Sequence, residues 1–199
     1  MSLSGTIDRR YTIDEYIRLE NDANDKHEFH DGEIIAMAGS TPQHSTISTN
    51  IIAVLHGRLQ GSPCRVHGAD LRIRVPRFPS FMYADALVIC GPISLDPEDK
   101  STMAVINPRV IVEVLSPTTE YLDRGRKFTR YLHLDSLQEY VLVSQDEPRT
   151  ETFFRQSDGT WSFAFWEGTD AIARIRCLDI ACPHAEVYAG VEFAPVVDD

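Results

Sequence analysis

Two short apolar stretches that each contain one acidic residue constrain this chain more than any other feature of its sequence. Residues 110–115 read Val-Ile-Val-Glu-Val-Leu between two prolines, and residues 83–90 read Tyr-Ala-Asp-Ala-Leu-Val-Ile-Cys. Runs of this length and composition predict strands that are buried on both faces. An ionised carboxylate costs free energy there unless a partner compensates it. We therefore expect Asp85 and Glu113 to share one compensating partner.

A divalent cation is the natural candidate for that partner. Residues 85, 87 and 89 share one face of their strand, as do residues 111, 113 and 115, and neighbouring strands bring opposed side chains to about 5 Å. Mg²⁺ takes one or two protein carboxylates and otherwise water and substrate phosphates, a combination suited to phosphodiester hydrolysis. The alternative is that each acid caps a neighbouring loop or pairs with a buried arginine. The residues alone leave both interpretations open.

Size and charge limit the classes of protein to consider. The 199 residues, 43% of them hydrophobic, predict a single globular domain, residues 1–199, with a sizeable core. The formal net charge of -11 argues against a passive phosphate-binding surface, although a local basic groove or ordinary solvated faces remain open. Candidates for such a groove are Arg72, Arg74, Arg77, Arg124, Arg126, Lys127 and Arg130.

The polar first ten residues and the spacing of the cysteines favour a cytoplasmic protein. Residues 1–10 contain no apolar segment of the kind found in signal peptides, and no run approaches the roughly 18 apolar residues of a membrane span. We therefore expect a cytoplasmic protein without a membrane partner. The four cysteines at 64, 90, 177 and 182 form no C-x-x-C pair, which favours reduced thiols over disulfides or zinc.

Local signals in the first third of the chain place two helices around a hairpin. Thr12 to Glu15 has the pattern of a capping box and opens a helix over residues 13–20. Asp31-Gly32 between apolar runs predicts a hairpin. Thr41 and Pro42 begin a second helix. Its apolar stripe, at helical spacing, consists of Ile47, Ile51, Val54 and Leu55, and His44 lies on the same side.

The rest of the chain predicts a mixed sheet. Short strands are expected at 64–67 and 71–75, the second with Arg72 and Arg74 facing outward, and a polar loop at 91–102. A helix over about 119–133, with Tyr121 inward and Asp123 and Lys127 outward, joins the Glu113 strand to a strand at 139–144, as in a parallel crossover. A meander at 151–155, 161–166 and 171–175, a short helix at 182–188 and a loose tail at 194–199 follow. This is an α/β or α+β chain.

Six stretches that occur in a fixed order carry a family resemblance. They are residues 26–34, 42–44, 70–75, 83–85, 112–117 and 123–128. In this order they resemble the Uma family of restriction endonucleases, which belongs to the PD-(D/E)XK nuclease superfamily. The resemblance covers residues 11–191. It implies a restriction-endonuclease-like core, a mixed sheet flanked by helices, here with additional antiparallel strands.

The resemblance also implies roles for particular residues. It implies that Asp85 is the aspartate of the first motif and Glu113 the acid of the second. The sequence departs from the pattern at Ala84, where the motif has proline, and at Leu115, where the superfamily has its lysine. The family supplies that lysine from the next helix, where Lys127 matches. From the helical pattern alone, Lys127 is an ordinary solvated lysine.

Two further residues have one structural and one functional interpretation. His44 is either a core histidine or a general acid or base, or contacts a metal through water, and the resemblance implies that it lines the site. Asp70 is either a turn residue or a third acidic group of the site.

The leading hypothesis is a Mg²⁺- or Mn²⁺-dependent endonuclease that acts on DNA, with Asp85 and Glu113 as metal ligands and Lys127, His44 and Asp70 completing the catalytic site. Two alternatives remain: a catalytically degenerate interaction or assembly module, and a phosphoesterase for RNA or small substrates. Many nucleases of this kind are homodimers. The aromatic residues that could supply an interface are Phe153, Phe154, Trp161, Phe163, Phe165 and Trp166.

Overall fold

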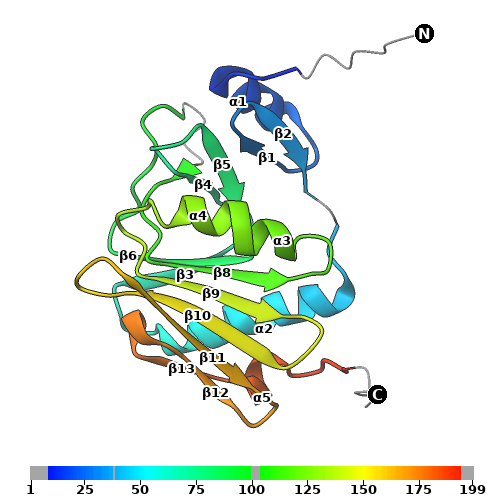
Figure 1. Cartoon of the computed structure of the whole chain (residues 1–199), viewed down its shortest axis with the longest axis vertical. Helices are drawn as coiled ribbons and strands as arrows, with labels where there is room; N and C mark the ends of the chain where they lie inside the picture. Colours follow the sequence, from blue (N-terminus) through cyan, green and yellow to red (C-terminus); the bar gives the residue numbers. More distant parts are fainter. Residues whose placement is uncertain (1–8, 38, 100–103, 194–199) are drawn as a thin grey trace.

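The structure, a computed structural model, describes residues 9–37, 39–99 and 104–193, and a six-stranded sheet runs through its middle (Figure 1). In the order β11-β10-β9-β8-β6-β3, its strands are β11 (Trp161–Glu167), β10 (Arg149–Arg155), β9 (Glu139–Ser144), β8 (Val110–Leu115), β6 (Ala86–Cys90) and β3 (Cys64–Gly68). The neighbours β8 and β9 are parallel, and the other pairs are antiparallel. The sheet is therefore mixed, as predicted.

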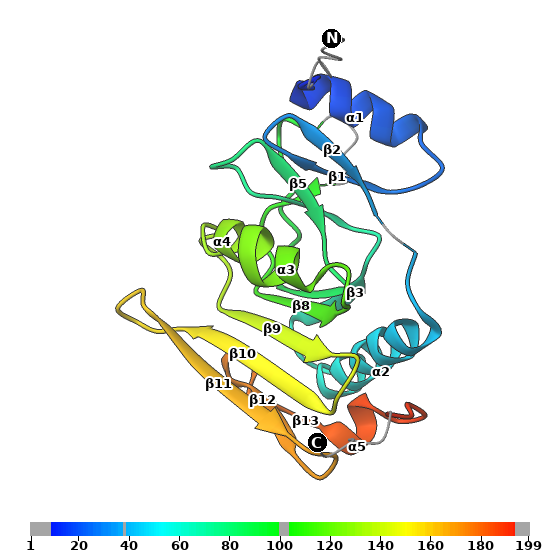
Figure 2. The same cartoon turned by 45° about the vertical axis from the view of Figure 1, so that its right-hand side comes forward.

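A smaller five-stranded sheet lies beside the larger one, beneath helix α1 (Ile13–Asp22) (Figures 1 and 2). Its strands, in order, are β2 (Glu33–Ala36), β1 (His27–His30), β5 (Ser80–Tyr83), β4 (Arg72–Arg74) and β7 (Ala104–Val105). The predicted capping box of Thr12 and Glu15 is present. The predicted hairpin is present too, because Asp31 and Gly32 adopt the positive φ angles, 52° and 95°, that a two-residue turn requires.

Helix α2 (Pro42–Arg58) covers one face of the six-stranded sheet (Figure 2). The Thr41 hydroxyl accepts a hydrogen bond from the His44 amide, which caps the helix where the sequence predicted. The predicted stripe of Ile47, Ile51, Val54 and Leu55 is buried against valines of β6, β8 and β9. On the opposite face of the sheet, a second cluster packs Ile111 and Leu115 against Tyr131 and Tyr140. Each strand of the centre therefore has two apolar faces.

The crossover from β8 to β9 is not the continuous helix that the sequence predicted. It consists of α3 (Glu120–Leu122), a π-helical turn (Asp123–Lys127) and α4 (Phe128–Tyr131). Tyr121 is 72% exposed, whereas Lys127 is only 7% exposed, so the predicted inward and outward faces were wrong for these residues. A π turn contains an extra residue, which shifts the faces on either side of it, and such turns are frequent at functional sites.

The predicted strand 83–90 is interrupted at Ala84 and Asp85. The residues before this break belong to β5 of the small sheet, and those after it belong to β6 of the large sheet. Asp85 therefore lies where the chain passes from one sheet to the other. At such a junction a side chain can face the gap between the sheets rather than a packed core.

The predicted outward orientation of Arg72 and Arg74 is also wrong, because both side chains are buried. Their guanidinium groups lie 3.6 Å from Asp99 Oδ2 and 3.3 Å from Asp96 Oδ2, respectively. These aspartates come from the predicted polar loop 91–102, whose residues 100–102 lie outside the described part of the chain. No local pattern in the loop indicates that it folds back over β4 with buried acids.

The C-terminal part differs from the predicted meander in one strand. Strands β10 and β11 form the expected hairpin, but β12 (Ile172–Ile175) pairs with β13 (Ile180–Pro183) in a separate sheet, with a 3-10 turn (Arg176–Leu178) between them. The short helix α5 (His184–Val187) follows, within the predicted range. The predicted tail 194–199 lies outside the described residues. Among those described, no helix is long and apolar enough to cross a bilayer.

The expectation of four reduced thiols is wrong for one pair of cysteines. Cys64 and Cys90 form a disulfide, whereas Cys177 and Cys182 are free thiols. The antiparallel register of β3 and β6 places Cys64 directly opposite Cys90. The sequence did not reveal this pairing because 26 residues separate the two cysteines and the register of β3 was not predictable.

We expect the disulfide to stabilise the fold by about 3 kcal/mol, because it restricts a loop of this length in the unfolded chain. In denaturant unfolding, the free energy of unfolding of the Cys64→Ser/Cys90→Ser variant should be lower than that of wild type by this amount. Cys177→Ser, which removes an unpaired thiol, is the control and should lower it by less. Equal stability of the oxidised and reduced wild type, or four titratable thiols in the denatured, unreduced protein, would contradict this assignment.

Candidate active site

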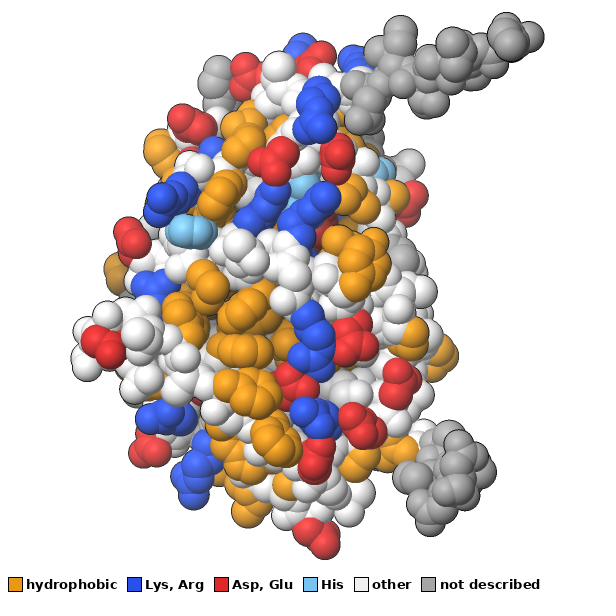
Figure 3. Space-filling model, in the orientation of Figure 1, with side chains coloured by type: hydrophobic (Ala, Val, Ile, Leu, Met, Phe, Trp, Pro, Cys, Tyr) orange, Lys and Arg blue, Asp and Glu red, His pale blue; other side chains and the backbone are white. Residues whose placement is uncertain are grey.

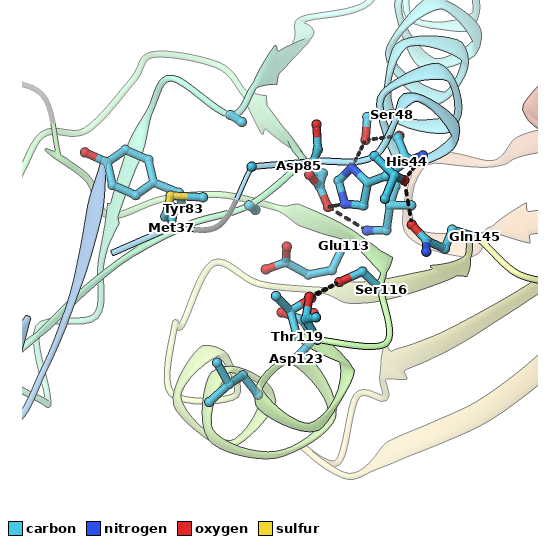
Figure 4. Close-up of a pocket in the computed structure, with 18 of the residues that line it drawn as sticks. Met37, His44, Ser48, Tyr83, Asp85, Glu113, Ser116, Thr119, Asp123 and Gln145 are labelled. Carbon is cyan, nitrogen blue, oxygen red and sulfur yellow. Dashed lines mark hydrogen bonds and ion pairs between the residues drawn. The ribbon is translucent and has the colours of Figure 1, made fainter. Parts of the chain in front are cut away.

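A pocket of about 750 Å³ opens between the two sheets and is lined by residues of β2, α2, the β5–β6 junction, β8 and the crossover. Figure 4 shows Asp85, His44, Glu113 and Asp123 converging on it from different elements. Three of these four side chains carry carboxylates, and Lys127 also lines the pocket. Most of the remaining lining is hydroxyl-bearing or apolar. The pocket therefore gathers an unusual density of acid in one place.

Asp85 and Glu113 lie together, as the two apolar stretches predicted. The antiparallel register pairs Ala86 with Val112, and its continuation by one residue brings Asp85 opposite Glu113. One oxygen of Asp85, Oδ2, accepts a 2.7 Å hydrogen bond from the Val114 amide, which fixes the carboxylate against the end of β8. Both side chains line the pocket (Figure 4).

The Lys127 ammonium lies at the centre of the acidic groups. Its Nζ atom is 2.7 Å from Glu113 Oε1 and 3.2 Å from Asp123 Oδ1, and it donates a 2.9 Å hydrogen bond to the Tyr83 carbonyl. Glu28 Oε1 is 3.4 Å away. Because an ammonium has three protons, the three nearest oxygens use its whole donor capacity. The π turn produces this arrangement by pointing Asp123 and Lys127 inward together.

Burial and charge act in opposite directions on the groups of this cluster. Burial raises the pKa of Glu113 well above its ordinary value, against the opposing charge of Lys127, and burial likewise raises the pKa of Asp123. Burial alone would lower the pKa of Lys127, but the charges of Glu113 and Glu28 outweigh it and hold that pKa well above its usual value. Four carboxyl groups, those of Glu28, Asp85, Glu113 and Asp123, line the pocket with one lysine, Lys127, which leaves room for an additional positive charge.

Glu28 is a residue of the cluster that sequence reasoning missed. Its Oε1 accepts a hydrogen bond from the Tyr83 amide at 3.0 Å, and its Oε2 lies 2.9 Å from His30 Nε2. The other ring nitrogen of His30, Nδ1, lies 3.0 Å from Arg130 Nη1. Since arginine can only donate, His30 Nδ1 accepts and His30 Nε2 donates to Glu28. The hairpin is thereby tied to the crossover.

Asp123 and Tyr131 also belong to the cluster without having been predicted. Tyr131 donates a 3.3 Å hydrogen bond to Glu113 Oε1. The spacing of Asp123 and Lys127, four residues apart, is a signal that could have identified the aspartate. No comparable signal exists for Glu28, because its approach to Lys127 depends on how the small sheet docks on the crossover.

His44 contacts Asp85 from the first turn of α2. Its Nε2 atom is 3.4 Å from Asp85 Oδ2, and its Nδ1 atom is 3.4 Å from the Ser48 hydroxyl (Figure 4). Burial lowers the pKa of His44, but the hydrogen bond and charge of Asp85 outweigh this and raise it. Of its two predicted locations, core or site, the structure places His44 at the site.

Asp70 and the predicted basic groove lie outside this arrangement. The Asp70 side chain is 95% exposed, pairs with Lys26 Nζ at 2.5 Å and does not line the pocket. It occupies the turn between β3 and β4, so the turn interpretation fits and the third-acid interpretation does not. Of the seven basic residues proposed for a groove, only Lys127 lines the pocket. Arg124 and Arg126 are paired with Glu151 and Glu33.

The carboxylates that line the pocket are the candidate ligands for a divalent cation. Within the described ranges, no three His, Cys, Asp or Glu side chains form a ready-made metal cluster. Mg²⁺ does not require one, because it binds through one or two carboxylates and completes its octahedron with water and phosphate. Asp85 and Glu113 supply those two carboxylates, and the excess of buried acid in the pocket favours a cation. The residues present therefore fit Mg²⁺ or Mn²⁺.

We expect the Glu28 carboxylate to stabilise the fold in a pH-dependent way. Burial alone would raise its pKa, but Lys127 and His30 outweigh burial and lower the pKa of Glu28 to about 2, against a reference value of 4.5. The stabilisation is therefore complete above about pH 5 and is lost as the pH falls towards 2. In denaturant unfolding at pH 7, the free energy of unfolding of Glu28→Gln should be about 2–4 kcal/mol lower than that of wild type.

The difference between wild type and Glu28→Gln should narrow by on the order of 2 kcal/mol between pH 7 and pH 3. Glu186→Gln, which removes an exposed charge paired with Arg58, serves as the control and should cost less than about 0.5 kcal/mol. A deficit for Glu28→Gln that does not change with pH would show that its charge is not the stabilising feature.

Known proteins resemble this chain in sequence and in fold. The family model Uma2, described as "Putative restriction endonuclease", matches residues 13–178. Two uncharacterized proteins of Synechocystis sp., slr1290 and sll1609, are 33% identical over 181 residues and 32% identical over 160 residues. The first alignment covers 90% of this chain and 92% of the relative, and the second covers 80% and 89%.

A solved structure shares the fold. The crystal structure of a putative nuclease belonging to DUF820 from Anabaena variabilis superposes with a TM-score of 0.71 at 18% identity, over 90% of this chain and 98% of that chain. This chain thus shares its α+β architecture, mixed sheets flanked by helices, with that protein. Because the family model spans most of the chain, this protein belongs to the Uma2 family of putative restriction endonucleases.

Proposed function

We propose that this protein is a Mg²⁺- or Mn²⁺-dependent endonuclease that hydrolyses DNA phosphodiester bonds. The observation that carries the proposal is the position of Asp85 and Glu113, side by side at the end of β8 and open to one pocket, with the Lys127 ammonium 2.7 Å from Glu113. Membership of a nuclease family supports the hydrolytic reaction. The metal requirement and the DNA substrate are the parts that experiment must decide.

Asp85 and Glu113 are the residues that would hold the cation. A bound divalent cation would lower the pKa of a water molecule and offset negative charge on the phosphoryl group. The hydrogen bond from the Val114 amide leaves the second oxygen of Asp85, Oδ1, available as a ligand. Tyr131 and Lys127 both contact Oε1 of Glu113 and so orient its other oxygen. These contacts position the ligands before substrate arrives.

Lys127 is proposed to stabilise the negative charge that develops on the phosphate. Its three protons face Glu113, Asp123 and the Tyr83 carbonyl. This favours a role for Lys127 as a fixed positive charge over a role as a hydrogen-bond donor to the attacking water. A charge in a largely buried site acts through a lower effective dielectric than one in solvent. In this proposal Lys127 compensates for Leu115, whose apolar side chain cannot supply a charge.

His44 is proposed to act as an acid at the opposite side of the pocket. Its Nε2 atom lies 3.4 Å from Asp85 Oδ2, and the ring lines the pocket. A protonated imidazole that lines the pocket is a suitable donor for a leaving oxygen. Asp70 has no place in this proposal, because its side chain points into solvent.

A homodimer and a cytoplasmic location remain proposals. Phe163 and Phe165 on the edge strand β11 are about half exposed, and they are the best candidates among the aromatic residues for an interface. Sedimentation of the wild type and of Phe163→Ser/Phe165→Ser would test this idea. A wild-type monomer at micromolar concentration would refute it.

We expect Mn²⁺ to bind wild type with one site in isothermal calorimetry, and Asp85→Ala and Glu113→Gln to lose that heat, because each removes a ligand. Cleavage of plasmid, linear and single-stranded DNA in Mn²⁺ should fall at least 100-fold in the same variants. Asp70→Ala is the matched control, since it removes an exposed carboxylate outside the pocket.

Equal heats of Mn²⁺ binding in wild type and Asp85→Ala would exclude the proposed metal site. Binding of Mn²⁺ without cleavage of any DNA would instead favour the degenerate interaction module. Cleavage of dinucleotide esters without cleavage of DNA would favour the phosphoesterase.

Lys127→Met should reduce the single-turnover cleavage rate by about 100-fold, because the variant lacks the charge beside Glu113. It should also lower the free energy of unfolding by about 3 kcal/mol, since Glu113, Glu28 and Asp123 would lose their shared cation. Arg126→Met, one residue away and well exposed, is the control for both measurements. A Lys127→Met enzyme with wild-type rate would exclude Lys127 from the chemistry.

A further inference from the structure

The acidic groups lie inside the pocket rather than on a surface that a duplex could contact. Glu113 is 3% exposed, and the Asp85 side chain is largely enclosed between α2 and β8. A phosphate on the outside of an intact double helix is held at the surface by its neighbours on the same strand. To reach Glu113, the nucleotide that carries the phosphate has to leave the stack and enter the pocket.

The size of the pocket agrees with an occupant of this kind. Its volume of about 750 Å³ falls in the range of pockets that enclose a small molecule. It can take one nucleotide with its flanking phosphates, whereas the groove for a duplex would have to extend across the surface. A pocket of this size therefore favours an unpaired segment.

The charge around the pocket also argues against binding through the backbone of a duplex. Among the described residues, Lys127 is the only lysine on the lining, and no arginine lines it. The nearby arginines are neutralised, Arg124 by Glu120 and Glu151, and Arg126 by Glu33. On the face of the molecule drawn in Figure 3, blue and red side chains are interspersed. Proteins that bind duplex DNA through its backbone neutralise several phosphates at once with lysine and arginine side chains.

The mouth of the pocket offers apolar and aromatic surface in place of cations. Tyr121, 72% exposed, lines it from the crossover. Ile35 and Met37 line it from β2 and the residue after it, and Ile52 lines it from α2. Unpaired bases bind proteins by stacking on such side chains, at about tenfold or more in affinity for each stacked base.

We propose that the substrate is an unpaired DNA segment, whose base stacks at Tyr121 while its phosphate reaches Asp85 and Glu113. This inference rests on the proposed function and names its substrate class. It places specificity in the apolar mouth of the pocket and chemistry in the acids at its floor. Single strands and bulges satisfy it, and a fully paired duplex does not.

The test compares three fluorescein-labelled oligonucleotides of one sequence: a single strand, a matched duplex and a duplex with a two-nucleotide bulge. Single-turnover cleavage by wild type in Mn²⁺ should be at least tenfold faster on the single strand and at the bulge than on the matched duplex. Anisotropy in Ca²⁺, with strand integrity checked on a gel, should give the same order of affinity. Raising salt from 50 to 200 mM should weaken single-strand binding by less than about tenfold.

Tyr121→Ala should weaken binding of the single strand about tenfold, whereas Tyr121→Phe should keep it because the ring remains. Leu19→Ala is the control, because it removes a half-exposed apolar side chain on α1 that does not line the pocket.

Equal cleavage of duplex and single strand, or equal binding by wild type and Tyr121→Ala, would overturn this inference while leaving the nuclease in place. If no DNA is cleaved, the proposed function fails, and the binding measurements alone then decide whether the pocket selects unpaired DNA.

Discussion

The structure depends on how one buried ammonium holds several carboxylates together. Lys127 Nζ lies within 3.4 Å of oxygens from Glu113, Asp123 and Glu28, and these residues come from the large sheet, the crossover and the small sheet. The same contacts therefore join three parts of the fold and concentrate acid in the pocket. A buried charge cluster of this kind costs free energy of desolvation that apolar packing would avoid. We interpret that cost as the consequence of keeping a site ready for a cation.

The location of the site follows from where the two sheets meet. Residues 80–90 form a strand in each sheet, with Asp85 at the passage between them. The register of β6 and β8 then brings Glu113 to the same point. The π turn completes the arrangement by directing Lys127 inward. A break in one strand and an irregular turn in one helix are the local departures from regular structure that the site requires.

The sequence predicted the elements that short-range physics controls. The capping box, the Asp31-Gly32 turn, the α2 stripe and the Glu113 strand were all found, because each depends on neighbours within a few residues. Residues whose environment depends on tertiary contacts were missed or misplaced. Arg72 and Arg74 alternate like outward residues but lie under a loop with buried aspartates. Glu28 approaches Lys127, 99 positions along the chain, only through sheet docking.

The central claim is that Asp85 and Glu113 hold one divalent cation. The most direct measurement is anomalous diffraction from a crystal of the wild-type protein soaked in Mn²⁺, recorded beside a crystal of Asp85→Ala. The account predicts one anomalous peak within bonding distance of a carboxylate oxygen of Asp85 and one of Glu113, and no peak there in the variant. A fully soaked wild-type crystal with no peak between these two residues would contradict it.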